Sequence, residues 1–158
     1  MKYEALGVFD MLKIGIGPSS SHTLGPWRAV QRFMEELDKT PGLEKINKIK
    51  ITLYGSLALT GAGHCTDKAI CLALLGYDPV TINVSQINEY LGGLSKEKIL
   101  KSEGKYYINF DPARDIVFNI ERIELKHPNT MKCTAYGESE QYESVFYSVG
   151  GGFVVKEG

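Results

Sequence analysis

The chain has 158 residues, a formal net charge of -1, and 43% hydrophobic and 23% charged residues. This composition is typical of one globular domain with a buried core, and the balanced charge gives no reason to expect nucleic acid or a membrane as partner. The apolar runs are too short to cross a bilayer, and the N-terminal residues lack the apolar core of a signal peptide. We therefore expect one domain over residues 1–158, in the cytoplasm.

The first strong helical pattern follows a polar stretch near the N-terminus. Val8–Leu12 could form a short helical turn, and a glycine loop with Pro18 separates it from five consecutive polar residues. These are Ser19, Ser20, Ser21, His22 and Thr23. After them, apolar residues recur at three- and four-residue steps. This spacing predicts a helix from about Thr23 to Asp38, ended by Thr40-Pro41-Gly42.

The five polar residues stand at the N-terminus of this predicted helix. Unpaired backbone N–H groups and the positive end of the helix dipole favour an anion at such a terminus, so the hydroxyls could bind a carboxylate or a phosphate. The alternative is that Ser21 or Thr23 only caps the helix and that the other serines fill a loop. Capping needs one hydroxyl rather than four, and the residues alone leave both interpretations open.

A strand and a second helix are expected next. Lys48–Tyr54 alternates apolar and polar residues, which predicts a half-buried strand. It leads into small residues from Gly55 to His64, whose glycines allow the backbone to approach a ligand closely. The second helix is expected from about Thr66 to Leu75, with Gly76 ending it in a left-handed conformation.

The remaining elements are short and together predict the fold class. The elements expected between Tyr77 and Asp115 are strands at Val80–Val84 and Tyr106–Phe110 and helices at Gln86–Leu91 and Lys96–Lys101. The expected strands of an antiparallel meander are Ile116–Leu125, Met131–Tyr136 and Glu143–Val149. Gly150-Gly151-Gly152 then indicates a flexible exit or a close backbone approach. This order predicts an α+β fold, a mixed and largely antiparallel sheet with helices packed on one face.

His64 is the best candidate for chemistry among the three histidines, which are the side chains that titrate near neutral pH. Its neighbours are glycines that leave room for a substrate, a helix N-terminus that attracts a negative group, and two residues that could orient the ring, Thr66 and Asp67. The alternative is that Thr66 and Asp67 simply cap the second helix. A lone histidine in a loop is also more often a surface residue than a catalyst.

Motifs of several common sites are incomplete. Ser56 lacks the G-x-S-x-G pattern of a hydrolase elbow, and the glycine loop before the serines lacks the third glycine of a dinucleotide fingerprint. The three cysteines, an odd number without C-x-x-C spacing, predict free thiols and no complete metal site. They are Cys65, Cys71 and Cys133.

Four segments resemble signatures of the iron–sulfur-dependent L-serine dehydratases. They are V-F-D-M-L-K-I-G-I-G-P-S-S-S-H-T-L-G-P (Val8–Pro26), Y-G-S-L-A-L-T-G-A-G-H-C-T-D-K (Tyr54–Lys68), H-P-N-T-M (His127–Met131) and Y-S-V-G-G-G-F (Tyr147–Phe153). The resemblance covers almost the whole chain, and motifs of this length and composition do not arise by chance. The chain is thus similar to the β part of these enzymes, as an N-terminal domain or as a separate subunit.

This resemblance implies an enzyme that converts L-serine to pyruvate and ammonia with a [4Fe–4S] cluster, whose exposed iron acts as a Lewis acid on the leaving hydroxyl. The cluster ligands belong to an α part that this sequence does not contain, so no cofactor is expected on this chain alone. The implied partners are L-serine and the α part, in a homo-oligomer of the complete enzyme. The β part is similar in fold to the allosteric substrate-binding domain of some phosphoglycerate dehydrogenases.

Carried onto this sequence, the resemblance makes His64, in the motif G-H-x-T-D, the candidate base for the α-proton. Cys65 stands where family members usually have a small residue, and could make the site sensitive to oxidation. The serine run would line a cleft against the α part and help to hold the carboxylate of the substrate or the edge of the cluster. The expected substrate contacts are Ser19, Ser20, Ser21, His22, Thr23, Gly63, Thr66 and Asp67.

Two other functions remain open at this stage. The chain could be a purely regulatory module that binds a small molecule such as serine, as in the phosphoglycerate dehydrogenase domain that it would resemble. It could also be a domain whose loops serve only to dock the α part. Substitution of His64 separates these hypotheses. It should abolish turnover if the chain contributes to catalysis, alter activation by serine if the chain is regulatory, and damage assembly if the chain only docks the α part.

Overall fold

The computed structural model describes residues 20–40, 45–61, 65–102 and 106–158. The helical elements are η1 (Ser20–Leu24), α2 (Gly25–Lys39), α3 (Ser56–Thr60), α4 (Thr66–Leu74), η2 (Val84–Gln86), α5 (Ile87–Glu97) and α6 (Pro112–Asp115). The strands are β1 (Lys48–Gly55), β2 (Ile99–Ser102), β3 (Tyr106–Asn109), β4 (Ile116–Asn119), β5 (Asn129–Tyr136), β6 (Gln141–Gly150) and β7 (Phe153–Lys156). The expected helical turn at residues 8–12 and the glycine loop after it lie outside the described residues.

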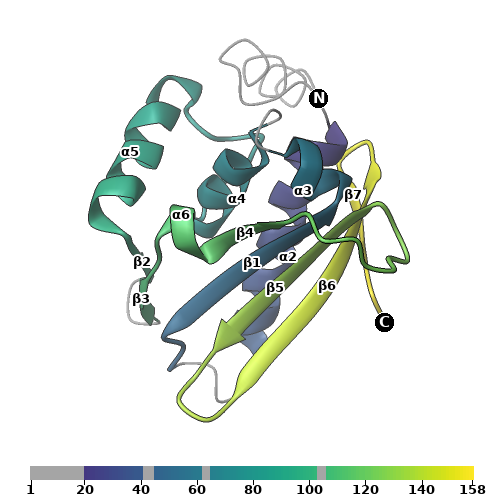
Figure 1. Cartoon of the computed structure of the whole chain (residues 1–158). Coiled ribbons are helices and arrows are strands. Elements are labelled where there is room, and N and C mark those ends of the chain that lie inside the picture. The colour runs from purple at the N-terminus through teal and green to yellow at the C-terminus, as the bar shows by residue number, and fades with distance from the viewer. Residues whose placement is uncertain (1–19, 41–44, 62–64, 103–105) are drawn as a thin grey trace.

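Five strands form one mixed sheet in the order β4-β1-β5-β6-β7, and β2 pairs with β3 in a small second sheet. Only the β1–β4 pair is parallel, and the other pairs of the large sheet are antiparallel. Helices α2 and α4 pack together on one face of this sheet, behind it in Figure 1. The predicted α+β class, with a largely antiparallel sheet and helices on one face, is therefore confirmed. The likeness to the phosphoglycerate dehydrogenase domain stays a prediction.

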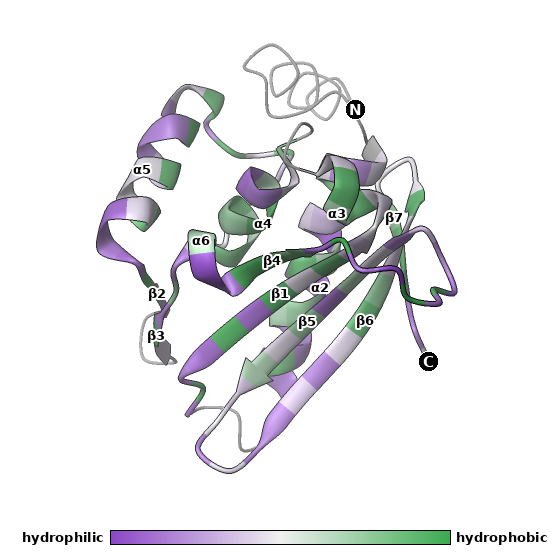
Figure 2. Ribbon diagram, viewed as in Figure 1, coloured by the Kyte–Doolittle hydropathy of each residue, from purple (hydrophilic) through white to green (hydrophobic). Residues whose placement is uncertain are grey.

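The core lies between α2 and the sheet. Trp27 and Phe33 on α2 are fully buried, as are Ile49, Ile51 and Leu53 on β1. The alternation along β1 sends these side chains to the helix-covered face, and Figure 2 shows the matching alternation of hydrophobic and hydrophilic residues along the strand. Each such side chain contributes about 1.5–3 kcal/mol of transfer free energy when it is fully buried.

The ends of α2 and α4 follow the sequence signals. The first helix is α2, preceded by the turn η1, and Thr40 ends it because its hydroxyl donates to Glu36 O at 2.7 Å and its backbone N–H donates to Leu37 O at 3.2 Å. Helix α4 ends at Leu74, and Gly76 follows with a φ of +90°, the left-handed conformation that its position predicts. None of the helices in the described ranges is long and apolar enough to cross a membrane.

The predicted strand at Val80–Val84 is wrong. The Asp78 carboxylate accepts a hydrogen bond from Val80 N at 2.8 Å, and the Asn83 side chain accepts one from Ser85 N at 3.2 Å. These side-chain turns compete with strand pairing and fold the segment into turns and the short helix η2. The helix expected at Gln86–Leu91 is confirmed within the longer helix α5, but the helix expected at Lys96–Lys101 is wrong, because α5 ends at Glu97 and the chain then forms β2.

The long strand expected at Ile116–Leu125 is shortened to β4, which ends at Asn119 because the Asn119 side chain accepts a hydrogen bond from Glu121 N at 3.0 Å. It pairs in parallel with β1, and so it is not part of the antiparallel meander. The meander consists of β5, β6 and β7 instead. The three glycines between β6 and β7 all have positive φ values and form the turn of that hairpin, rather than a flexible exit.

Candidate functional site

The serine run enters helix α2 through an unusual turn. Ser20–Leu24 forms one π-helical turn, η1, which continues directly into α2 at Gly25. Single π-helical turns are rare and occur frequently at functional sites. The N-cap of α2 is Leu24, rather than Ser21 or Thr23, and it makes no side-chain cap hydrogen bond.

The His22 imidazole joins η1 to α3. Its Nδ1 atom lies 2.8 Å from the Ser21 Oγ atom, and its Nε2 atom lies 2.9 Å from the Ser56 Oγ atom. A neutral imidazole donates through one nitrogen and accepts through the other, so one hydroxyl donates to the ring and the other receives its proton. The hydroxyl that receives the ring proton keeps its own O–H for another acceptor. Ser21, His22 and Ser56 are all half-buried at this point.

Two buried hydroxyls hold the backbone of η1 in place. The Thr66 hydroxyl, at the start of α4, donates to the His22 carbonyl oxygen, and Thr66 is 0% exposed. The Ser148 hydroxyl, near the end of β6, donates to the Ser21 carbonyl oxygen at 2.6 Å. The carbonyl oxygens of η1 are thus bound by elements 44 and 127 residues distant in sequence. The alternative interpretation of Thr66 as a cap is wrong, because Cys65 occupies the N-cap of α4.

The segment His127–Asn129 forms the next wall of the site. Gly55, between β1 and α3, has a φ of +59°, and a Cβ atom there would lie 2.3 Å from the Pro128 carbonyl oxygen. That oxygen accepts a hydrogen bond from Ser56 N at 2.8 Å. Only glycine allows this approach, and the approach places Ser56 against the His127–Asn129 turn.

Asn129 carries an unsatisfied acceptor at this junction. Its side-chain nitrogen donates to the Ser148 carbonyl oxygen at 3.3 Å, and its backbone N–H donates to His127 Nδ1 at 3.0 Å. Its side-chain oxygen is buried and has no hydrogen-bond partner among the described residues. Buried polar atoms are almost always paired, so this oxygen indicates that a donor from outside the described residues belongs here.

The β6–β7 turn closes the site on the side of η1. Gly152 has a φ of +80°, and a Cβ atom there would lie 2.7 Å from the Leu24 side chain. Beside this turn, Val149 and Phe153 are 49% and 73% exposed, and Leu59 on α3 is 71% exposed. Large apolar side chains are therefore exposed on the two elements that carry Ser56 and Ser148, namely α3 and the β6–β7 hairpin. Figure 1 shows these elements.

The structure brings some of the predicted site residues together and separates others. Ser21, His22 and Thr66 lie in the hydrogen-bonded group described above, and Thr23 is buried beside them in η1. Asp67 does not join them, and instead lines a cavity of about 520 Å³ with Lys98 and Asp111. Ser20 begins η1. Ser19, Gly63 and His64 lie outside the described residues.

Three residues of the hydrogen-bonded group were not predicted as site residues. Ser56, Asn129 and Ser148 each lie in one of the four motif segments, but no pattern in the sequence indicates that they meet. For Ser56, the absence of a hydrolase elbow argued against a nucleophile and gave no reason to consider hydrogen bonding to a histidine. The signal that could have found them is the polar character of single residues within otherwise apolar or glycine-rich motifs.

The cysteines are not arranged as ligands of a cluster. Burial raises the pKa of the Cys71 thiol to about 12, with a smaller contribution from Asp67, and complete burial raises that of Cys133 further. Both thiols are therefore protonated and buried at neutral pH. No group of three or more His, Cys, Asp and Glu side chains in the described ranges could hold a metal ion. These residues therefore do not fit an iron–sulfur cluster.

The model of the serine dehydratase beta chain family matches residues 7–158. The chain belongs to this family. It is also 38% identical over 154 residues to L-serine dehydratase 1 of Escherichia coli, 39% identical over 155 residues to the L-serine dehydratase of Haemophilus influenzae, and 38% identical over 155 residues to that of Helicobacter pylori.

The matches with these serine dehydratases cover nearly all of this chain, but only a smaller part of each relative's length. The matches cover 96–97% of the chain and only 33–34% of these three relatives. The chain thus spans about a third of the length of the dehydratases that it matches. All five segments of the hydrogen-bonded group, around residues 21, 56, 66, 129 and 148, fall within the range that the family model matches.

Proposed function

We propose that this chain is the β part of an L-serine dehydratase and that it supplies a candidate base and substrate contacts to a cleft shared with an α part. The observation that supports this function is the set of contacts that the neighbouring Ser21 and the elements α3, α4 and β6 make with the His22 ring and the backbone of η1. Four of these contacts use hydroxyl groups, from Ser21, Ser56, Thr66 and Ser148. A scaffold that served only stability would gain little from so many polar contacts at one point.

In this function the Ser21–His22–Ser56 group binds the polar end of L-serine. Of the two hydroxyls beside the ring, the one that receives the ring proton offers its own O–H to a substrate oxygen. A carboxylate is the natural acceptor, because the group lies in the turn that precedes the N-terminus of α2, where the helix dipole favours an anion. Thr66 and Ser148 fix the backbone of η1 and so act as positioning residues.

His64 remains the proposed base for the α-proton. It lies outside the described residues, but Thr66, two residues further on, donates to the His22 carbonyl oxygen, and Thr66 N donates to Gly61 O at 2.9 Å. The first of these contacts ties a described neighbour of His64 to the group around His22. The α-proton and the carboxylate of serine are carried by the same carbon atom, so a base near this group would reach the proton that the reaction removes.

The iron–sulfur cluster belongs to the α part in this proposal, since the described cysteines do not fit it. The α part also accounts for two features of the site. The Asn129 side-chain oxygen has no donor among the described residues, and large apolar side chains are exposed on the flanking elements. A surface contributed by the α part would supply the donor and cover the apolar residues. The cytoplasmic location and the homo-oligomer of the complete enzyme stay predictions.

The test is anaerobic L-serine turnover, first with this chain alone and then with the chain mixed with a reconstituted α part. We expect turnover only in the mixture, and we expect the His64→Asn variant to lose it while still binding the α part. The matched control is His127→Asn. The Asn129 backbone N–H donates to His127 Nδ1, and the side-chain oxygen of an asparagine at position 127 can accept the same hydrogen bond. This control should retain most of the turnover.

Three other outcomes would each overturn a part of the proposal. Turnover by the α part alone, unchanged by this chain, would exclude a catalytic contribution. Normal turnover of His64→Asn with altered activation by L-serine would favour the regulatory function instead. Loss of binding to the α part in the same variant would favour the docking function.

A further inference from the structure

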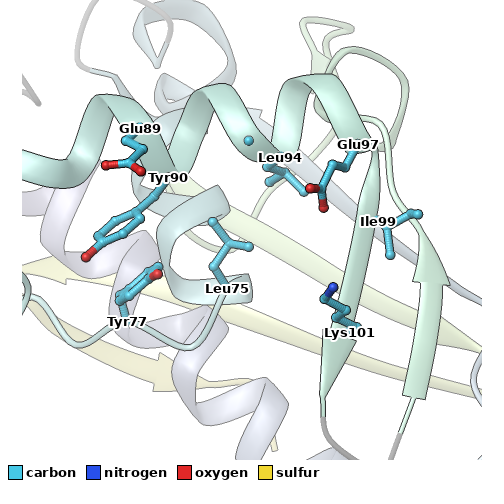
Figure 3. Close-up of a pocket in the computed structure, with 9 residues that line it drawn as sticks. Leu75, Tyr77, Glu89, Tyr90, Leu94, Glu97, Ile99 and Lys101 are labelled. Atoms are coloured by element: carbon cyan, nitrogen blue, oxygen red, sulfur yellow. The ribbon is translucent and has the colours of Figure 1, made fainter.

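A second hollow lies on the other side of the molecule from the β6–β7 hairpin. It is a groove of about 380 Å³ between the end of α4, helix α5 and strand β2 (Figure 3). Figure 1 shows where these three elements lie in the fold. This volume is within the range of small-molecule sites. None of its lining residues belongs to the hydrogen-bonded group around His22.

The middle of the groove is apolar and one end is aromatic. Leu75, Leu94 and Ile99 line the middle. At the aromatic end the Tyr77 and Tyr90 rings stack with centroids 4.1 Å apart and an angle of 14° between their planes (Figure 3). The Tyr90 ring is fixed at its hydroxyl, which donates to Gln86 at 2.6 Å. The Tyr77 backbone is fixed by the Trp27 indole N–H, which donates to its carbonyl oxygen at 2.9 Å. The stack is therefore a preformed wall.

Three charged side chains line the groove: Glu89 and Glu97 on α5, and Lys101 on β2. Figure 3 shows the Glu97 carboxylate directed inward from α5 and the Lys101 ammonium group directed inward from β2. These two side chains do not form an ion pair with each other, and neither has an ion pair or side-chain hydrogen bond with another of the described residues. A ligand that carries both an ammonium group and a carboxylate would pair with both of them at once.

We propose that this groove binds a free L-α-amino acid with an apolar side chain. Its ammonium group pairs with Glu97, its carboxylate pairs with Lys101, and its side chain covers Leu75 and Leu94 and extends toward Tyr90. The proposal does not depend on the dehydratase function, because the two sites have no described residue in common. L-Serine itself is a poor ligand for this groove, since its short polar side chain would leave the apolar middle exposed to water.

Gly93 gives the proposal its sharpest test. It lines the groove from the interior of α5, where glycine costs about 1 kcal/mol relative to alanine. A Cβ atom at Gly93 would meet nothing within 4 Å, so packing within the chain does not require glycine there. The absence of a side chain leaves the groove open. Gly92, its neighbour, also has open space around it but does not line the groove, and it provides the matched control.

The experiment is calorimetric titration of the full chain with L-phenylalanine and L-leucine. We expect saturable binding of both and at least tenfold weaker binding of L-serine. Gly93→Leu should abolish the binding, whereas Gly92→Leu should leave it within about twofold, and both variants should fold because leucine is a better helix former than glycine. Binding that survives in Gly93→Leu, or that is lost equally in both variants, would overturn the proposal.

The two charges are tested separately with ligands that lack one of them. Phenethylamine has no carboxylate and 3-phenylpropionate has no ammonium group, so each should bind about tenfold more weakly than L-phenylalanine. Glu97→Gln should weaken the binding of phenethylamine and leave that of 3-phenylpropionate unchanged. Lys101→Met should weaken the binding of 3-phenylpropionate and leave that of phenethylamine unchanged. Absence of binding by both amino acids at millimolar concentration, with dehydratase activity intact in the complete enzyme, would refute the groove proposal and leave the proposed function standing.

Discussion

The His22 Nε2 atom lies 2.9 Å from the Ser56 Oγ atom and joins two motif segments that are 34 residues apart in sequence. Because Ser56 begins α3 directly after β1, this one contact sets the distance between the serine turn and the end of β1. The Ser21 hydroxyl engages the other ring nitrogen, so the ring is held from both sides. The pair is therefore expected to act as a unit.

We expect His22→Asn and Ser56→Ala each to lower kcat/KM for L-serine by about 10- to 100-fold in the complete enzyme, the loss expected for a hydrogen bond to a charged group. Because both residues support one arrangement, the double variant should be no worse than the more damaging single variant. Thr60→Ala is the control, since it removes an exposed hydroxyl from the same helix that donates only to Ser56 O. Losses that multiply in the double variant would show that the two residues act independently.

Gly55 is expected to be the glycine least tolerant of substitution near the site. Gly55→Ala should lower the free energy of unfolding by about 3 kcal/mol or more, because a positive φ and a contact with the Pro128 carbonyl oxygen both oppose a Cβ atom. Gly76→Ala is the control, since Gly76 has a φ of +90° but open space around it, and should cost only about 1–2 kcal/mol. Urea denaturation measures both. Equal losses of unfolding free energy in the two variants would show that the Pro128 carbonyl oxygen does not oppose a Cβ atom at position 55.

Long elements with a clear period were predictable from the sequence, and sheet order was not. Helix α2 and strand β1 each repeat their apolar residues regularly and end at proline or glycine signals. The parallel pairing of β4 with β1 depends on the packing of distant segments, which no local pattern records. The turns at Asp78 and Asn83 depend on side-chain hydrogen bonds that the strand-like composition of this segment conceals.

At the site, the sequence predicted which segments carry the polar residues but not which side chains meet. Thr66 and Asp67 are the clearest case. Successive residues of a helix point about 100° apart, so Thr66 contacts the backbone of η1 while Asp67 faces a different cavity. The contacts of Ser56 and Ser148 with η1 depend on the sheet order, and so they could be found only once the fold was known.

The buried cysteines should resist alkylation in the folded chain. Burial raises the pKa of Cys71 to about 12 and raises that of Cys133 still more, so both thiols stay protonated and covered at neutral pH. Treatment with iodoacetamide followed by peptide mass spectrometry should find Cys71 and Cys133 unmodified without denaturant and modified in urea. Modification of either one at the same rate under both conditions would contradict the packing of the core. Cys65, which is half-buried, serves as the internal reference.

The last prediction concerns Glu36, which ties α2 to the C-terminal strands. Burial opposes ionisation of its carboxyl group, but hydrogen bonds from Lys156 at 2.8 Å and Tyr142 at 2.9 Å outweigh it and lower the pKa below the ordinary value of 4.5. A carboxyl group whose pKa is lowered by folding stabilises the folded state at pH values above its ordinary pKa. This stabilisation is lost as the pH falls through the lowered pKa. Glu36→Gln should therefore cost about 1 kcal/mol near neutral pH and clearly less at about pH 3.5. Urea denaturation at the two pH values measures this, with Glu35→Gln on the exposed side of α2 as the control that should change little at either pH. A cost of Glu36→Gln that stays constant or grows as the pH falls would show that the ionised carboxylate does not stabilise the contact between α2 and the β6–β7 hairpin.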